Sequence, residues 1–318
     1  MKFAVGVDLG GTAIKFGLFQ TDGDLIYETS RPTGAERPYE QVLIDIVNQI
    51  KHMLDENHIH ESDLVGIGVG IPGPVTDESK VNHCVNLGWE EVDVGHYIKK
   101  HFDCRVKVGN DANVAALGEI RAGAAKGYRS MVLITIGTGI GGGIVIDGKI
   151  LAGNHGAGGE VGHIPFLKTP LDRVCGCGGQ RCFEQICSAP NIVTRTKELL
   201  ASSDEDSVLR KDLDKLDTEI IYKAAARGDK LAIEITDETA NEMGRALAII
   251  GAVVDPEVFV IGGGVSAAGD GLFKPLRNYY EKYCFREGKN VPIVLASLGN
   301  KAGIYGAAGL VLEEDSQL

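Results

Sequence analysis

The spacing of hydrophobic residues alternates along the chain between a strand-like and a helix-like pattern. Apolar runs at 3–8, 13–19 and 25–30 are separated by short glycine-containing turns, which predicts an antiparallel meander. Between 38 and 56 the apolar positions recur at steps of three and four, which predicts an amphipathic helix, and 64–71 predicts a buried strand. This order of strands and helices predicts an α/β fold with a largely parallel sheet.

The rest of the chain continues the same alternation. A strand at 105–108 precedes a helical run at 114–125, and a long amphipathic helix is predicted at 236–254. A short buried strand at 258–261 follows it and leads into a run of glycines. Residues 199–216 are charged and at first aperiodic, so we expect an exposed helical excursion there.

One part of the sequence is faintly repeated. Residues 5–23 resemble 133–148, because each has an apolar strand, a glycine-rich turn with a threonine, a second strand and an Asp-Gly hairpin. Two related α/β domains, each offering one glycine turn to a shared cleft, would explain the repeat. A chance likeness of two glycine-rich hairpins is the alternative.

Composition narrows the function. The chain has 43 glycines among 318 residues, well above the usual share of about 7%, and no collagen-like period, so the glycines serve specific turns. The net charge of −12, without a Lys/Arg cluster, disfavours nucleic acid or an anionic membrane as partner. The longest apolar stretch is too short to span a bilayer, and Asp8 interrupts any signal peptide. With an odd number of cysteines, a soluble cytoplasmic protein with reduced thiols is expected.

Three glycine turns follow predicted strands. Asp8-Leu9-Gly10-Gly11-Thr12 is the first, 137–143 the second and 262–266 the third. Main-chain N–H groups of such a turn can converge on a phosphate, while the hydroxyl and carboxylate of the first turn can organise a hydrated Mg²⁺. One such hairpin alone is more often only a hairpin, but three favour a phosphate site. Neither the Walker A pattern nor a GxGxxG motif between strand and helix is present.

A cysteine cluster predicts a structural metal site. Cys175, Cys177 and Cys182 lie within eight residues, with glycines between them, and His163 precedes them by twelve residues. Three thiolates and one imidazole form the closed tetrahedral set expected for structural zinc. Buried inert thiols are the alternative, although packing does not account for such close spacing.

Two groups of polar residues stay ambiguous on sequence alone. Asn110 and Asp111 follow a strand and start a helix, so they either cap that helix or carry chemistry. Glu160 and His163, with Glu184 further along, could bracket vicinal hydroxyls of a sugar or belong to solvated polar turns. We interpret Lys15 as a surface residue of a strand.

These motifs together resemble the ROK family (repressor, open reading frame, kinase) of the sugar-kinase/actin/Hsp70 superfamily, over nearly the whole chain. The resemblance implies two ribonuclease-H-like domains of the actin/hexokinase type with an interdomain cleft. The smaller N-terminal domain would comprise 1–118 and 302–318, and the larger domain, with the zinc loop, 119–301. In the family such turns bind ATP, which assigns nucleotide binding to Asp8, Gly10, Gly11, Thr12, Gly137, Thr138, Gly139, Gly262, Gly263 and Gly264.

The resemblance also favours a functional role for these polar residues over a merely structural one. It implies that Asp111 is the catalytic base, and that Asn110, Asp111, Glu160, His163 and Glu184 bind the sugar, with His163, Cys175, Cys177 and Cys182 holding zinc. The family pattern CxCGxxGC is present except at Arg181, where the family often has glycine, so the loop conformation there is open. Asn86 lies in an Asn-Leu-Gly-Trp stretch like the family's and would reach the substrate; a surface loop with Trp89 packed beneath it is the alternative.

The activity implied is ATP-dependent phosphorylation of a hexose at its 6-hydroxyl, with glucose expected, Mg²⁺ as cofactor and Zn²⁺ as structural ion. Other ROK kinases act on fructose, mannose, allose or N-acetylated amino sugars, and some members are non-catalytic sugar-sensing repressors. Polyphosphate or another nucleotide as phosphate donor is also open. The family is commonly dimeric or tetrameric, so a homo-oligomer is expected.

Overall fold

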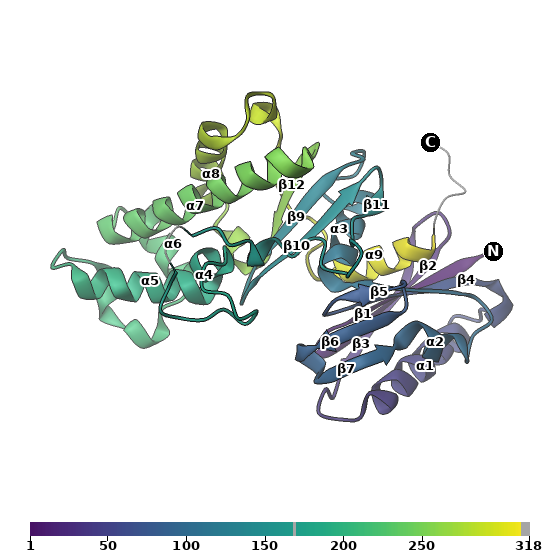
Figure 1. Cartoon of the computed structure of the whole chain (residues 1–318). Helices are drawn as coiled ribbons and strands as arrows, with labels where there is room; N and C mark the ends of the chain where they lie inside the picture. Colours follow the sequence, from purple (N-terminus) through teal and green to yellow (C-terminus); the bar gives the residue numbers. More distant parts are fainter. Residues whose placement is uncertain (168–169, 313–318) are drawn as a thin grey trace. The chain divides into compact units, whose positions relative to one another are not determined.

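The computed structural model describes residues 1–167 and 170–312, in which three sheets and the helices around them are found (Figure 1). The strands are β1 (Phe3–Leu9), β2 (Ala13–Gln20), β3 (Leu25–Pro32), β4 (Leu64–Ile71), β5 (Val75–Thr76), β6 (Lys80–Cys84), β7 (Trp89–Asp93), β8 (Arg105–Asn110), β9 (Met131–Ile136), β10 (Ile140–Ile146), β11 (Lys149–Ile150), β12 (Val258–Gly262) and β13 (Ile293–Leu295). The helices are α1 (Tyr39–Glu56), α2 (Val94–Lys99), α3 (Asp111–Ala122), α4 (Glu184–Cys187), α5 (Ala189–Ser202), α6 (Thr218–Ala226), α7 (Lys230–Val254), α8 (Asp270–Tyr283) and α9 (Ala302–Val311).

The two larger sheets have the same strand order. One runs β3-β2-β1-β4-β8 and the other β11-β10-β9-β12-β13, and a small sheet β5-β6-β7 accompanies them. In the first, β1, β2 and β3 are antiparallel, whereas β4 pairs in parallel with both β1 and β8. The matching order confirms the predicted α/β class and accounts for the sequence repeat as a duplicated fold.

The chain forms two compact units. Unit 1 comprises Met1–Leu133, Gly143–Gly159 and the C-terminal segment from Ala296, and unit 2 comprises Ile134–Gly142 and Glu160–Leu295. The domain boundaries inferred from the sequence, at 118 and 301, stay a prediction. Residues 168–169 of the larger predicted domain and 313–318 of the smaller lie outside the described residues.

Helix α1 covers one face of the first sheet, as its apolar spacing predicted. Its buried side chains, among them Val42, Ile46, Ile50 and Met53, recur at steps of three and four. They pack in one core with inward-facing residues of β1, β2 and β4. The helix starts after Pro38, whose fixed φ suits a helix entrance, so the predicted helix at 38–56 is confirmed to within one residue.

Helix α9 packs on the same sheet (Figure 1), and at two points its backbone meets the backbone of the strands directly. A Cβ atom on Gly68 would lie 1.7 Å from the carbonyl oxygen of Ala307, and one on Gly6 would lie 2.1 Å from that of Ile304. Glycine is therefore required where β1 and β4 meet α9. This contact seats the helix directly on the sheet.

In unit 2 the long helix α7 starts earlier than predicted. It begins at Lys230, with the Asp229 side chain accepting from the Ala232 N–H, whereas the apolar spacing indicated a start at 236. Leu231, Ala232 and Ile235 continue the apolar spacing through the first turns, with an exposed Ile233 among them. Within 199–216, helix α5 ends at Ser202 and only short 3₁₀ turns follow, so the predicted helical excursion is only partly helical.

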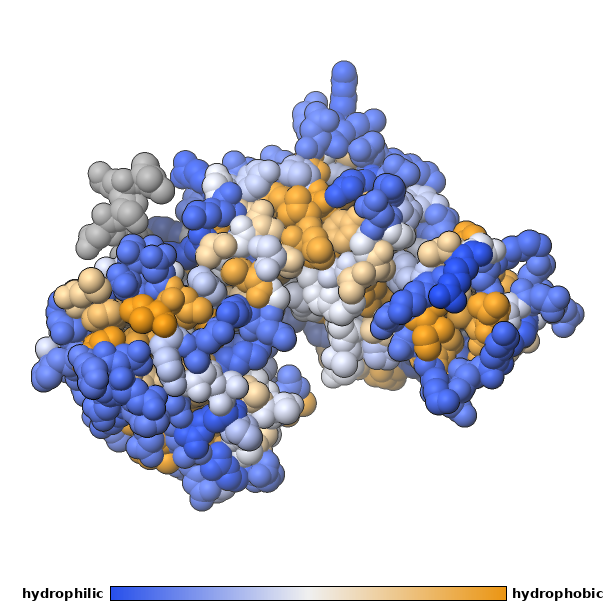
Figure 2. Space-filling model, turned by 180° about the vertical axis from the view of Figure 1, so that it is seen from behind, coloured by the Kyte–Doolittle hydropathy of each residue, from blue (hydrophilic) through white to orange (hydrophobic). Residues whose placement is uncertain are grey.

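Hydrophobic and hydrophilic residues both reach the surface. On the face drawn in Figure 2, hydrophilic residues prevail and hydrophobic ones form separate patches. Among the residues that the structure describes, no helix combines the length and the apolar character that crossing a bilayer requires.

We predict that Gly68→Ala lowers the free energy of unfolding by about 3 kcal/mol, because the added methyl group collides with the backbone of α9. Gly271→Ala is the matched control, since its Cβ would lie 3.7 Å from the nearest atom, in Tyr222, and alanine favours the helix. Thermal unfolding followed by circular dichroism compares the two. An unchanged melting temperature for Gly68→Ala would show that this contact is not tight.

Candidate active site

In unit 1 the first glycine turn is closed by its own backbone and by a buried threonine. The Gly10 N–H donates to the Ala13 carbonyl at 3.0 Å. The Thr33 hydroxyl donates to the Gly10 carbonyl at 2.6 Å, and the Thr33 N–H donates to the Thr12 carbonyl at 3.0 Å. Thr33 is fully buried and fixes the turn from behind. Thr33 was missed by sequence reasoning, because nothing in its own neighbourhood marks it.

Asp8 has a cationic neighbour that the sequence did not indicate. The antiparallel register of β1 and β2 sets Lys15 opposite Asp8, with Nζ 3.3 Å from Oδ2. Lys15 also donates to the Asn300 carbonyl at 3.2 Å. Lys15 is a part-exposed residue of strand β2, and its contact with Asp8 is an addition that the sequence did not show, because the register across the turn was unknown.

Asn110 and Asp111 stand at the start of α3, where β8 ends. The Asn110 carbonyl oxygen accepts from the N–H groups of Ala112 and Asn113, both at 3.1 Å, and its amide donates to the Gly73 carbonyl at 3.2 Å. Asn110 is thus the N-cap, as the capping interpretation predicted. Asp111 is the first helical residue, partly exposed, and its Oδ1 accepts from the Ala112 N–H at 2.8 Å. The positive end of the helix dipole favours a carboxylate at this position.

The loop with Asn86 lies against the first glycine turn. A Cβ atom on Gly11 would lie 3.2 Å from the Asn86 carbonyl oxygen, while Asn86 as a whole is exposed. Trp89 is 6% exposed and packs edge-on against Tyr39, with ring centroids 6.1 Å apart. Trp89 is therefore packed beneath the loop, as the surface-loop alternative predicted. The loop also places Asn86 beside a candidate phosphate turn.

In unit 2 Glu184 is held against the second glycine turn. Its Oε2 accepts from the Ile140 N–H at 2.8 Å, and a Cβ on Gly139 would lie 2.4 Å from that oxygen. The turn itself is closed by the Gly137 N–H, which donates to the Gly139 carbonyl at 2.9 Å. Glycine at 139 therefore leaves the room that the carboxylate occupies.

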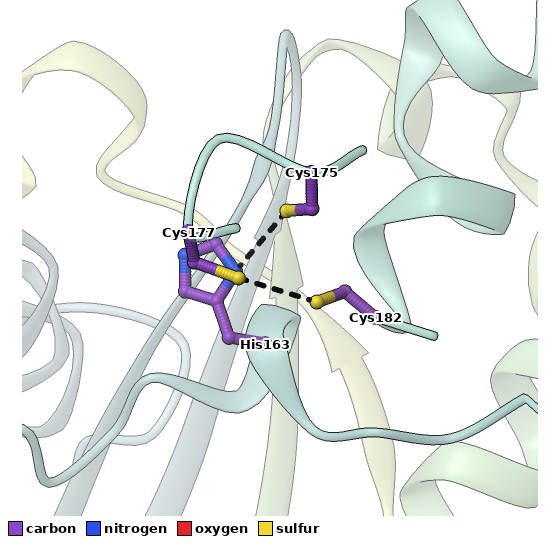
Figure 3. A group of neighbouring side chains, drawn as sticks. All are labelled: His163, Cys175, Cys177 and Cys182. Atoms are coloured by element: carbon purple, nitrogen blue, oxygen red, sulfur yellow. Dashed lines mark hydrogen bonds between the residues drawn. The ribbon is translucent and has the colours of Figure 1, made fainter. Parts of the chain in front are cut away.

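The predicted metal ligands converge in unit 2, as Figure 3 shows. The Sγ of Cys175 lies 3.6 Å from Nδ1 of His163, and Sγ of Cys177 lies 3.4 Å from Sγ of Cys182. All four ligand atoms lie within 4.8 Å of one another. Ligand atoms bound tetrahedrally to one zinc ion would lie roughly 3.5–3.8 Å apart. The set therefore fits a tetrahedral ion.

Burial also shapes the chemistry of this cluster. It raises the pKa of the Cys175 thiol to about 12, so without a cation the group keeps its proton at neutral pH. A metal ion that binds there must displace this proton, because only the thiolate is a good ligand.

The candidate sugar ligands of unit 2 adjoin this cluster. Nε2 of His163 lies 3.9 Å from Oε2 of Glu160, and the Cys175 thiol donates to Oε1 of Glu184 at 3.2 Å. The structure thus brings Glu160, His163 and Glu184 into one group with the cysteines. A metal ion on Nδ1 would leave Nε2 of His163 on the side of Glu160.

The loop conformation tolerates Arg181. Its backbone is not among the residues with positive φ, so glycine is not needed there, whereas Gly178 has φ of 86°. The Arg181 carbonyl accepts from the N–H groups of Phe166 and Leu167, at 2.8 and 3.1 Å. The departure from the family pattern therefore concerns only the side chain.

Gln185 ties the two ends of the cysteine loop together. It is 3% exposed, its Nε2 donates to the Arg173 carbonyl at 2.7 Å, and its Oε1 accepts from the Cys182 N–H at 3.0 Å. Sequence reasoning missed this residue, since its position next to Glu184 was the only hint.

The third glycine turn borders a cavity in unit 2. Gly263 has φ of 82°, and a Cβ there would lie 2.4 Å from the Ile136 carbonyl oxygen, so the backbone requires glycine. A cavity of about 310 Å³ lies beside it, lined by Thr218 and Tyr222 of α6 and by Gly264 and its neighbours. Its size and mixed lining suit a flat heterocycle.

A model of the ROK family matches residues 4–314 of the chain. The sequence is 37% identical to a glucokinase of Halalkalibacterium halodurans, over 100% of this chain and 97% of that protein.

Two solved structures are similar over nearly the whole chain. One is a ROK family glucokinase from Streptomyces griseus in complex with glucose and AMPPNP, which is 32% identical with a TM-score of 0.75, covering 97% of this chain and 98% of that one. The other is a ROK hexokinase from Thermus thermophilus, 31% identical with a TM-score of 0.81 over 96% of each chain.

Proposed function

The chain belongs to the ROK family, and we propose that it is a glucokinase, which transfers the γ-phosphate of ATP to the 6-hydroxyl of glucose. Its relative from Halalkalibacterium halodurans is a glucokinase, and the Streptomyces griseus glucokinase structure holds glucose and an ATP analogue. The fold is the actin/hexokinase type of α/β fold expected from the sequence. The observation that carries the proposal is the group formed by Glu160, His163 and Glu184 beside a glycine turn, since it offers paired hydroxyl ligands next to a phosphate site.

Asp111 is proposed as the general base. Its carboxylate would accept the proton of the 6-hydroxyl as that oxygen attacks the γ-phosphate. Its place in the first turn of α3, next to the Asn110 cap, and the bond from the Ala112 N–H orient the carboxylate. Because phosphoryl transfer is largely dissociative, position matters more than basicity.

The sugar would be bound by Asn86, Asn110, Glu160, His163 and Glu184. Carboxylates accept from sugar hydroxyls, and an imidazole nitrogen can donate or accept. One N–H of the Asn110 amide donates to the Gly73 carbonyl, so the second N–H is available to donate to a sugar hydroxyl. A wrong epimer would leave such groups unmatched, which is a strong basis for selection.

ATP would be held by the three glycine turns. We assign the phosphates to Asp8, Gly10, Gly11, Thr12, Gly137, Thr138 and Gly139, and the adenosine to Gly262, Gly263 and Gly264 beside the cavity of unit 2. Mg²⁺ near Asp8 would offset the phosphate charge, with Lys15 as a second cation there. A cationic Lys15 beside Asp8 also reduces the net negative charge of this turn, which would otherwise repel the phosphates.

Zinc is proposed as the ion of the Cys175, Cys177, Cys182 and His163 cluster, which fits a closed tetrahedral site. When bound it supplies structural order, fixing the loop and one nitrogen of His163. Gln185 joins the two ends of the loop, and Glu184 accepts a hydrogen bond from Cys175. A well-ordered loop would therefore also fix the position of the proposed sugar ligand Glu184.

Other assignments stay open to the same assay. Fructose, mannose, allose or N-acetylated amino sugars are alternative substrates, polyphosphate is an alternative donor, and a sugar sensor without turnover is the remaining class. A cytoplasmic location, the absence of a nucleic-acid partner and a dimeric or tetrameric assembly are proposals that rest on the net charge and the family.

We predict that the purified protein releases ADP from ATP fastest with glucose, and that the product is glucose 6-phosphate. A coupled assay over the sugars and donors named above measures this, with the product identified by mass spectrometry and NMR. Turnover confined to another sugar would replace the substrate, and sugar binding without turnover for any donor would favour the sensor.

Asp111→Asn is expected to keep glucose binding, measured by titration calorimetry, but to lose about 10²–10⁴-fold in kcat, because the amide cannot accept the proton. Asp147→Asn is a matched control at an exposed hairpin position whose φ of 49° asparagine tolerates, and it should leave kcat unchanged. Near-normal turnover of a folded Asp111→Asn protein would remove Asp111 from the mechanism.

Elemental analysis should find one zinc ion per chain in active protein. Cys182→Ser is expected to lose the ion and to weaken glucose binding at least tenfold, because the loop beside Glu184 loses its order. Cys284→Ser, outside the cluster, should keep both. Fully active protein without bound zinc would contradict a structural role for the metal.

A further inference from the structure

Glu119 of α3 is a buried carboxylate for which the proposed mechanism gives no role. It is 1% exposed, and the described residues provide no ion pair for it. Its Oε2 accepts from the Ala124 N–H at 2.8 Å and from the Ser297 N–H at 3.2 Å. Its Oε1 accepts from the N–H groups of Ser297 and Leu298, at 3.1 and 2.9 Å, and the Ser297 hydroxyl lies 3.4 Å from Oε2.

Such an arrangement needs a reason, because removing a carboxylate from water is costly unless donors replace the solvent. Here main-chain N–H groups from two distant segments take that role. Glu119 therefore fastens Ser297 and Leu298 to α3, and Ala124 to the end of the same helix. A neutral amide could accept on one atom only, so the carboxylate is the group that holds all three amides.

Helix α3 connects Glu119 to Asp111. Both residues belong to α3, eight positions and about 12 Å apart along its axis. The helix cannot slide against α9, because their backbones touch. A Cβ on Gly118 would lie 2.3 Å from the Ala302 carbonyl oxygen, and one on Gly306 would lie 1.7 Å from that of Val114.

The segment bound by Glu119 leads to Asp8. Ser297 and Leu298 run through a 3₁₀ turn, Gly299–Lys301, into α9. Within that turn the Asn300 carbonyl accepts from Lys15, the cationic neighbour of Asp8. At the start of α9, a Cβ on Gly303 would lie 2.5 Å from Cγ of Asp8.

We propose that Glu119 is a positioning residue that sets Asp111 relative to the Asp8 turn within unit 1. It fixes the entrance of α9 on α3, and α3 carries Asp111 while the entrance of α9 abuts Asp8 and Lys15. The inference rests on the proposed function, in which Asp111 is the base and the Asp8 turn holds phosphate. A displacement of the base by about 1 Å suffices to cost some 10²-fold in rate.

Glu119→Gln tests this in the full-length protein, because it keeps the volume and turns one acceptor into a donor that faces main-chain N–H groups. We expect kcat to fall about 10–100-fold while the KM for glucose stays within about threefold. Hydrogen exchange at the amides of Ser297 and Leu298 should be faster. Ile50→Val is the control, since it removes one buried methyl group from α1 of the same unit and should lower the melting temperature without changing kcat.

If Glu119→Gln does not accumulate as folded protein, Glu119→Asp is used, which keeps the charge, reaches fewer amides and should give a smaller fall in kcat. An unchanged kcat in a folded variant whose Ser297 and Leu298 amides exchange faster would overturn the proposal, as would an equal loss of kcat in Ile50→Val. Failure of the proposed function looks different, because Asp111→Asn would then keep its turnover. Inactive Asp111→Asn with fully active Glu119→Gln would refute only the positioning role.

Discussion

The backbone contact of α9 with its neighbours is the constraint on which unit 1 depends. Glycines at 6 and 68 let the helix touch β1 and β4, and glycines at 118 and 306 let it touch α3. At these four glycines no side chain lies between the two backbones, so none can adapt to a shift there. The same helix begins against Asp8 at Gly303, and α3 begins with Asp111. Steric exclusion thus fixes the positions of the two carboxylates that the proposed mechanism uses, and Glu119 holds the start of α9 in place.

Unit 2 reaches a comparable order by polar means. Glu184 links the second glycine turn to Cys175, and Gln185 joins the two ends of the cysteine loop. These hydrogen bonds alone give the loop a defined conformation, which a bound metal ion would stabilise further. The two units differ in this way because of their composition. Small residues gather in α3 and α9, whereas the loop of unit 2 is rich in cysteine and glycine.

Much of this could be predicted from local sequence. The strand at 64–71 was correct to the residue and the helix at 38–56 nearly so, since both have regular apolar spacing. The four candidate metal ligands were found because their spacing is distinctive, and they converge as expected. The true start of α7 was missed, although Leu231, Ala232 and Ile235 carry the apolar spacing back to its first turn.

Residues whose role depends on strand register or on how a loop folds could not be found in this way. The pairing of Lys15 with Asp8 needs the register of a hairpin, and Glu119 looks like a solvent-facing residue until the segment from 297 is placed beside it. Gln185 likewise acts only through the fold of a loop.

The most direct test of the account is a crystal structure with glucose and a non-hydrolysable ATP analogue. It should place a carboxylate oxygen of Asp111 within about 2.6–3.2 Å of the glucose 6-hydroxyl, on the side of the γ-phosphate. Glucose bound with its 6-hydroxyl out of reach of Asp111, while the analogue occupies the glycine turns, would contradict the account.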